Sequence, residues 1–289
     1  MSVKRLALLF TLLLTFALVA CGGGNAAEEP EASGEAPASD TAAETASGLP
    51  DLGGREVTVA VENAYLPFNY IDPQPGEPAG WDYEALAAIC ALLNCVPTYV
   101  EAAWEGMIQA VADGQYDMAA DGITITEERR EIVDFSDGYI RIDQRLLARA
   151  DEDRFTTVQE FVDNADLMMG TQTGTTNYDT ASRILPTERI QAFEQFPFAV
   201  QALLAGDVDA VIIDETAGMG YLGVNADSLK LVGESLESQE LGFVFPKGSD
   251  LVGPFNAALA ELEANGTLAT LAEKFFTDAF TVTYEDLEG

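Results

Sequence analysis

Length, composition and charge limit what this 289-residue chain can be. Nearly half of its residues are apolar (48%), which is enough for packed cores in one large domain or two ordinary ones. The formal net charge of −35 argues against a nucleic-acid partner, because phosphate binding needs clustered lysine and arginine. The chain has no histidine, so Ser-His-Asp catalysis and histidine-ligated metal sites are excluded as well.

The N-terminal segment predicts export. Lys4 and Arg5 precede an apolar run at 6–20 that is too short for an ordinary spanning helix and is typical of a signal peptide, residues 1–20. The run ends in Leu18-Val19-Ala20-Cys21, which resembles a bacterial lipobox and implies lipidation of Cys21. The alternative is a plain secretion signal followed by an incidental cysteine.

Residues 21–54 predict a lipidated cysteine followed by a flexible acidic tether. The segment is rich in Gly, Ala, Ser, Pro and Glu and has almost no large apolar side chain before Leu49, so it cannot bury enough surface to fold. The globular part is then expected outside the cytoplasm, anchored to the membrane at the cell surface or in the periplasm.

Two more cysteines, Cys90 and Cys95, lie close together after the tether. Export to an oxidising compartment favours a disulfide between them. The alternative is that Cys90 is a small core residue of a helix and that neither cysteine is paired, since the gap crosses a helix end.

The folded part alternates strands with helices, which indicates an α/β fold with mostly parallel sheets. Asp82 is interpreted as the N-cap of its helix, and Asp121 as a turn residue. The first half predicts strands at 57–61, 98–101 and 116–120 and helices at 82–93 and 104–112. The second half predicts strands at 145–150, 167–171, 190–193, 208–213, 229–232 and 241–245, with helices from 174 to 185 and at 198–204, 251–265 and 267–276.

A short internal sequence repeat relates the two halves. Gln109-Ala-Val followed by Gly114-x-x-Asp117 has the same spacing as Gln201-Ala-Leu followed by Gly206-x-x-Asp209. An acidic residue, Asp121 or Asp214, follows each copy near the end of its strand, at the sheet edge where open α/β folds bind ligands. A chance similarity between two helix–strand turns is the alternative.

The stretch from Asp113 to Ser136 predicts an anion site. A Gly-Ile-Thr-Ile-Thr turn at 122–126 sets Thr124 close to Arg129 and Arg130 in a chain that has few bases. Arg129 is interpreted as the anion-binding residue, although it could instead pair with acidic neighbours on a solvated helix. Arg130 is interpreted as that surface residue.

Several motifs in order resemble the extracytoplasmic solute-binding proteins of the polar amino-acid type, which serve ABC importers. The resemblance covers about residues 55–280. The motifs are Tyr65-x-Pro67-Phe68, Gly80-Trp81-Asp82, Trp104 with Met107 and Ile108, Gly122-Ile-Thr-Ile-Thr-x-x-Arg129, Phe135-Ser136, Gly174-Thr-Thr176, Val208-Asp-Ala-Val-Ile-Ile-Asp214 and Phe245-Pro-Lys-Gly248.

The resemblance implies a two-lobe periplasmic-binding-protein type II fold, each lobe a mostly parallel sheet flanked by helices, with two crossing hinge segments near 143–145 and 238–241. Lobe 1 is expected to be discontinuous, residues 55–142 plus 241–289, and lobe 2 to span 143–240. The protein is expected to be a monomer that binds a free amino acid, closes around it and docks on a membrane permease. No cofactor or metal is implied.

The resemblance also implies a site. Arg129 and Thr124 would hold the ligand carboxylate with an N–H of Thr176, and Thr124 would donate its hydroxyl as well. Asp214 and the Gly122 carbonyl would accept the ammonium. The side chain would lie between Tyr65 and Trp104, with Glu62 and Gln172 at its far end.

The acidic residues Glu62 and Asp121 slightly favour a cationic ligand, lysine, arginine or ornithine, over glutamine. Trp104 as plain core and Glu62 as a strand-end residue remain alternatives. The rival function is an enzyme of the same fold, such as a cyclohexadienyl (prephenate/arogenate) dehydratase with Glu62, Asp121 or Glu215 as acid or base. A ligand-sensing module for a receptor is the third possibility.

Overall fold

A computed structural model describes residues 48–282, apart from 75, 226 and 278. The predicted signal peptide, the lipidation of Cys21 and most of the tether lie outside these residues. Two five-stranded sheets and one small three-stranded sheet form the framework. None of the described helices is long and apolar enough to cross a membrane.

The first sheet has the strand order β5-β1-β6-β13-β7. Its β1 pairs in parallel with β5 and β6, while β13 is antiparallel to both β6 and β7. Four strands therefore run one way and β13 runs the other. The bounds are β1 Arg55–Val61, β5 Cys95–Glu101, β6 Met118–Ala119, β7 Val133–Phe135 and β13 Val244–Pro246.

The second sheet repeats this plan, with the order β10-β9-β11-β8-β12. Here β8 is the one reversed strand, because it is antiparallel to both β11 and β12. The predicted mostly parallel sheets are confirmed, each with one reversed strand. The bounds are β8 Ile140–Arg149, β9 Met169–Gln172, β10 Ile190–Phe193, β11 Ala210–Asp214 and β12 Leu229–Leu241.

Helices cover both faces of each sheet, and the alternation of strand residues explains how. Leu146 and Ile212 point into one core with α4 and α5, whereas their neighbours Leu147 and Ile213 point into another with α6 and α7. In the first sheet, Val59 packs with α1 and α8, and Ala60 packs with α2. The helices are α1 Trp81–Leu93, α2 Met107–Ala112, α3 Glu127–Arg130, α4 Val158–Asp163, α5 Thr176–Ile184, α6 Phe196–Ala205, α7 Glu215–Asn225, α8 Val252–Ala264 and α9 Thr267–Phe275.

The small sheet consists of β2 Ala64–Tyr65, β3 Asn69–Ile71 and β4 Pro78–Ala79. It occupies the connection between β1 and α1. This connection contains the run from Tyr65 to Phe68, in which Phe68 is fully buried.

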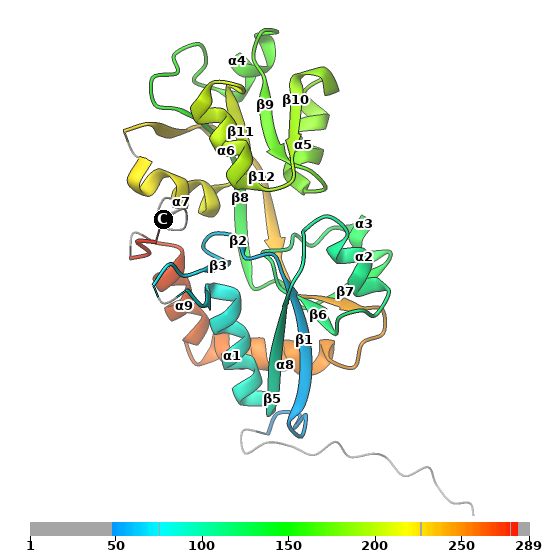
Figure 1. Cartoon of the computed structure of the whole chain (residues 1–289). Coiled ribbons are helices and arrows are strands. Elements are labelled where there is room, and N and C mark those ends of the chain that lie inside the picture. The colour runs from blue at the N-terminus through cyan, green and yellow to red at the C-terminus, as the bar shows by residue number, and fades with distance from the viewer. Residues whose placement is uncertain (1–47, 75, 226, 278, 283–289) are drawn as a thin grey trace, which may run out of the picture. The chain divides into compact units, whose positions relative to one another are not determined.

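Two long strands connect the sheets. The chain leaves the first sheet through β8 and returns through β12, and these strands pair with each other at Ser238↔Asp143 and Leu241↔Ile140 (Figure 1). The predicted crossing segments are therefore partners in one antiparallel ladder. A register shift between Val232 and Glu237 interrupts that ladder.

The aspartates of the internal sequence repeat, Asp117 and Asp209, have equivalent structural roles. Asp117 Oδ2 accepts the backbone N–H of Thr58 at 2.8 Å, and Asp209 Oδ2 accepts that of Met168 at the same distance. In both sheets the aspartate stands just before a parallel pair, Val59↔Met118 or Met169↔Ala210. The two aspartates therefore fix equivalent strand registers.

Several expected elements differ from those observed. The 104–112 helix begins only at Met107, after the left-handed Gly106, and the strand at 229–232 continues to Leu241. Helix α7 was not predicted; it contains three glycines, which lower its helix propensity, and it is held by packing on β8, β11 and β12.

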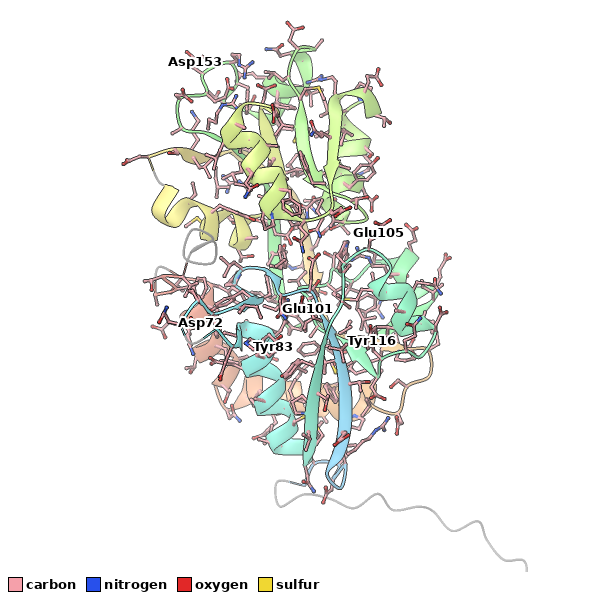
Figure 2. The ribbon with its side chains drawn as sticks, viewed as in Figure 1. Asp72, Tyr83, Glu101, Glu105, Tyr116 and Asp153 are labelled. Atoms are coloured by element: carbon pink, nitrogen blue, oxygen red, sulfur yellow. A yellow bond between two sulfur atoms is a disulfide. The ribbon has the colours of Figure 1, made fainter. Side chains whose placement is uncertain are left out.

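The excess negative charge is spread over the surface. Glu101, Glu105 and Asp153 are exposed and project from different parts of the ribbon (Figure 2).

Cys90 and Cys95 form a disulfide that ties the end of α1 to the start of β5.

Candidate functional site

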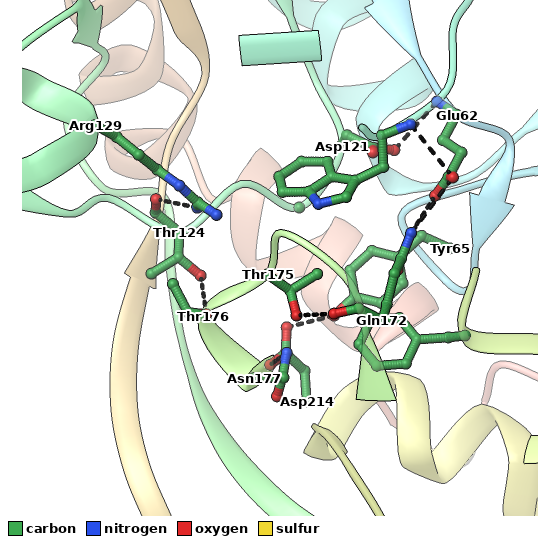
Figure 3. A pocket seen from close by; sticks show the side chains of 13 residues that line it. Glu62, Tyr65, Asp121, Thr124, Arg129, Gln172, Thr175, Thr176, Asn177 and Asp214 are labelled. Atoms are coloured by element: carbon green, nitrogen blue, oxygen red, sulfur yellow. Dashed lines mark hydrogen bonds between the residues drawn. The ribbon is translucent and has the colours of Figure 1, made fainter. Parts of the chain in front are cut away.

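A cavity lies where the carboxyl ends of β1 and β6 face those of β9 and β11. All nine ligand-binding residues predicted from the sequence line it, from both sheets (Figure 3). The wall consists of Glu62, Tyr65, Trp104, Asp121, Gly122, Thr124, Arg129, Gln172, Thr175, Thr176, Asn177, Phe196 and Asp214.

Arg129 brings a positive charge to the cavity. Its backbone is fixed in the short helix α3, where the side chain of the N-cap Thr126 accepts the Arg129 N–H. The guanidinium donates to the Thr124 carbonyl at 2.8 Å and lies 5.3 Å from the centre of the Trp104 ring. Burial lowers the pKa of Arg129 to about 10, so the side chain remains charged at neutral pH.

Arg130 lies outside this cavity, as predicted. It is exposed, stands near Glu127 and lies over the ring of Phe135.

Asp214 brings the opposite charge from the second sheet. It ends β11, it is only 3% exposed, and it accepts hydrogen bonds from the Tyr65 hydroxyl and from Asn177 Nδ2. Burial raises the pKa of Asp214 to about 6, while these hydrogen bonds and the charge of Arg129 oppose the shift. The carboxyl is therefore mostly ionised at neutral pH.

Arg129 and Asp214 are close enough for each charge to affect the pKa of the other. One follows a strand of the first sheet and the other ends a strand of the second. The opposite charges of Arg129 and Asp214, held near each other in one cavity, are complementary to the two charges of a small zwitterion.

The aromatic wall differs in detail from the expected arrangement. The Tyr65 ring stacks on Phe68 at 5.4 Å and on Phe196 at 5.7 Å, while Trp104 lies beside Arg129. Gly122 has a φ of 56°, and a Cβ there would stand 2.8 Å from the Tyr65 ring. Glycine at 122 therefore allows the turn and the close approach of Tyr65.

Glu62 and Gln172 form a polar end of the cavity. The Glu62 carboxylate accepts from Gln172 Nε2 at 3.3 Å and from Gln195 Nε2 and the Trp104 N–H at 3.4 Å. Burial raises the pKa of Glu62, and the same hydrogen bonds partly offset the shift.

The buried carboxyl groups of Asp121 and Asp82 share one amide donor, the side chain of Asn69. Asp121 Oδ1 accepts from Asn69 Nδ2 at 2.6 Å, and the same amide donates to Asp82 Oδ2 at 3.0 Å. Burial, together with the charges of Glu62 and Asp82, raises the pKa of Asp121 well above its ordinary value.

The predicted N-cap role of Asp82 is wrong. Helix α1 begins at Trp81 with Gly80 as its N-cap, and Asp82 is a fully buried residue of the first turn. Gly80 has a φ of 128° and packs on the Phe68 carbonyl, so the connection after β4 determines where the helix begins. Burial raises the pKa of Asp82 to about 7.

Three cavity residues were not identified from the sequence: Thr175, Asn177 and Phe196. Thr175 caps α5 by accepting the Tyr178 N–H, a role that the Gly-Thr-Thr run could have indicated. Phe196 begins α6, and only the tertiary structure brings it to Tyr65.

Two α/β units joined by paired crossing strands, with a charged cavity between their strand ends, define the type II periplasmic-binding-protein fold. The sequence matches the bacterial extracellular solute-binding proteins, family 3, over residues 57–278. The chain belongs to this family.

Named relatives agree with this assignment. The chain is 29% identical over 224 residues to the L-cystine-binding protein TcyJ of Escherichia coli (strain K12), covering 75% of this chain and 81% of that protein. It is 27% identical over 278 residues to the arginine-binding extracellular protein ArtP of Bacillus subtilis (strain 168), covering 95% and 98%. A solved ancestral arginine-binding protein bound to arginine is 29% identical with a TM-score of 0.71, covering 77% of this chain and 98% of that structure.

Proposed function

We propose that this protein is the extracytoplasmic receptor of an ABC importer and captures a polar amino acid. The observation that carries the proposal is the pair Arg129 and Asp214, two opposite charges that reach one small cavity from different sheets. An α-amino acid has the complementary pair on its carboxylate and ammonium. The relatives named for cystine and arginine binding support the same ligand class.

Arg129 would bind the carboxylate in the two-pronged geometry that guanidinium favours, and Asp214 would accept the ammonium with the Gly122 carbonyl. The N–H of Thr176 at the start of α5 would complete the anion site. The ligand side chain would extend past Tyr65 and Trp104 to Glu62 and Gln172.

We favour a cationic side chain, arginine, lysine or ornithine, with glutamine as a close second. The Glu62 carboxylate at the polar end supports the cation, and the amides of Gln172 and Gln195 suit either ligand. A thermal-shift screen against the twenty amino acids plus ornithine and citrulline tests this order, because a bound ligand raises stability by mass action.

Capture would proceed by closure of two lobes, residues 55–142 plus 241–289 and residues 143–240. The pairing of β8 with β12 supports these boundaries, because the ladder spans the two positions where the chain passes between sheets. The ligand would favour the closed state because its groups touch both lobes at once. The closed form would then dock, as a lipid-anchored monomer, on a membrane permease.

Arg129→Ala tests the site directly. A carboxylate left unpaired in a buried cavity costs roughly 3–5 kcal/mol, so affinity should fall at least about 100-fold in calorimetry. The matched control is Arg130→Ala, which removes an arginine outside the cavity and should leave the affinity unchanged. Wild-type affinity in Arg129→Ala would reject the assignment.

The rival proposal is an enzyme of the same fold, and the raised pKa values of Glu62 and Asp121 would suit an acid or base. We favour a binding protein without catalytic activity because both carboxylates are engaged by neighbouring donors and the cavity charges match an amino acid. Turnover of prephenate or arogenate by the purified protein would reverse this preference. Signalling to a receptor instead of a permease would appear as ligand-dependent binding to that receptor.

A further inference from the structure

The side-chain oxygen of Gln239 is the common acceptor of a hydrogen-bond cluster beside the cavity. It accepts from Thr176 Oγ1 at 2.8 Å, from Thr124 Oγ1 at 3.1 Å and from Gln144 Nε2 at 3.3 Å. Thr124 follows β6 of the first sheet, whereas Thr176 begins α5 beside the second. Gln144 and Gln239 lie on the crossing strands β8 and β12. The Gln239 oxygen therefore links two binding loops, the one that contains Thr124 and the one that leads into α5 at Thr176, to the connection between the sheets.

The strand register explains why the two glutamines meet. Gln239 pairs with Ile142, and Glu237 pairs with Gln144, so Gln144 and Gln239 lie on the same face of the β8–β12 ladder. Gln144 is fully buried and also donates to Thr176 Oγ1 at 3.1 Å. Ser238, one residue before Gln239, lies on the opposite face and is exposed.

The hydroxyl protons of the two threonines are used within this cluster. A threonine hydroxyl has one proton to donate. Thr176 Oγ1 accepts from Gln144 and donates to Gln239, and Thr124 Oγ1 donates to Gln239 or, at 3.3 Å, to Thr176. A ligand carboxylate would then accept hydrogen bonds from backbone N–H groups and from Arg129. It would not accept one from the Thr124 hydroxyl, which the sequence had led us to expect.

We propose that Gln239 is a positioning residue that holds the two binding loops together around a bound amino acid and thereby slows its release without contacting it. This inference rests on the proposed function. The loop of the first sheet is held to β12 by the Ile125 N–H, which donates to the Glu240 carbonyl at 2.9 Å, and by the Gly242 N–H, which donates to the Ile123 carbonyl at 3.0 Å. The side chain of Gln239 extends this contact to Thr176, beside the second sheet, through a neutral hydrogen bond. Loss of one such neutral hydrogen bond weakens a closed state by about 3- to 10-fold.

Stopped-flow tryptophan fluorescence tests the proposal, because Trp104 lines the cavity. The probes are L-arginine and L-glutamine. Gln239→Leu removes the acceptor of three donors, so it should raise the dissociation rate constant by at least the roughly 3- to 10-fold expected for one lost bond, by the same factor for both ligands, and leave the association rate constant unchanged. Ser238→Ala is the matched control on the opposite face and should behave as wild type.

Thr124 variants keep the proposal testable if Gln239→Leu does not fold. Thr124→Val removes the hydroxyl that donates to Gln239 and should speed release more than Thr124→Ser, which retains a hydroxyl. Where the double variant folds, Gln239→Leu with Thr124→Val should release ligand no faster than Gln239→Leu alone, because both changes break the same link.

Different results reject different claims. Additive effects in the double variant, wild-type release from Gln239→Leu, or a change in the ratio of arginine to glutamine affinity would overturn the role of Gln239. If the wild-type protein binds neither these two ligands nor any other amino acid, the proposed function fails first.

Discussion

Four buried carboxyl groups lie in or next to the cavity, and their hydrogen-bond partners differ. Glu62 is 8% exposed and bonded to amides, Asp214 is bonded to a tyrosine and an asparagine, and Asp121 shares the Asn69 amide with Asp82. Burial raises the pKa of all four. Of the four, Glu62, Asp121 and Asp214 line the cavity. Asp214 is the one proposed to accept the ligand ammonium, so the pH dependence of binding is expected to follow its ionisation.

Asp214 predicts a pH dependence of binding. The ammonium needs the ionised carboxylate, so affinity should be constant above about pH 7 and fall about tenfold for each pH unit below the pKa of about 6. Isothermal titration calorimetry from pH 4.5 to 8 measures this profile.

Asp214→Asn should bind weakly and without that dependence, whereas Glu62→Gln should keep the wild-type profile. A flat wild-type profile would contradict the role of Asp214. Asp214 has the opposite effect on the stability of the ligand-free protein. Because the pKa of Asp214 is higher in the folded than in the unfolded state, its contribution to the free energy of unfolding declines as pH rises from about 4 to about 6.

At the scale of elements, the sheets are built on one repeated unit. A helix ends at a left-handed glycine, Gly114 or Gly206, and an aspartate three residues later accepts an N–H of the neighbouring strand. The next strand then delivers a carboxylate, Asp121 or Asp214, to the cavity. The short sequence repeat therefore corresponds to a repeated helix–strand unit that places an acidic residue at the edge of each sheet.

The two register-fixing aspartates predict a stability loss. Asp117→Ala and Asp209→Ala should each lower the free energy of unfolding by about 1–3 kcal/mol, because each leaves a backbone N–H without its acceptor. Asp209→Ala should cost more, because Asp209 pairs with two arginines, Arg149 and Arg154, whereas Asp117 pairs with Arg55 at 3.6 Å.

Urea denaturation measures both values, and Asp153→Ala, an exposed residue, is the control. Equal stability of all three variants and wild type would mean that the shared register contact contributes nothing.

At the scale of the whole molecule, the formal charge of −35 is the dominant feature. Like charges spread over the surface repel one another more strongly in the compact state than in an expanded chain. Added salt screens that repulsion over about 10 Å at 0.1 M.

Raising NaCl from about 10 mM to about 0.5 M should therefore raise the thermal unfolding midpoint by a few degrees. Differential scanning calorimetry measures the shift. KCl at equal ionic strength should act equally, because screening does not depend on the cation's identity. A midpoint that falls with salt would show that attractive ion pairs, such as those at Asp209, outweigh the general repulsion.

The alternation of strands and helices and the return of the chain to its first sheet could be predicted from the residues alone, and the family motifs led to the nine residues that meet in the cavity. The nine residues follow from the motifs shared with the solute-binding proteins. Two of them, Glu62 and Asp214, directly follow or end apolar strands, and parallel strands bring such positions to one edge. The Gly-Ile-Thr-Ile-Thr turn added a specific local signal.

Only the tertiary structure decided the remaining features. Helix α7 forms by packing and not by propensity, and Asp82 is buried because Gly80 and the small sheet shift the start of α1. Phe196 and Gln239 come from segments distant from their partners Tyr65 and Thr124. Contacts of this kind depend on how two sheets meet, which the local pattern of a sequence does not contain.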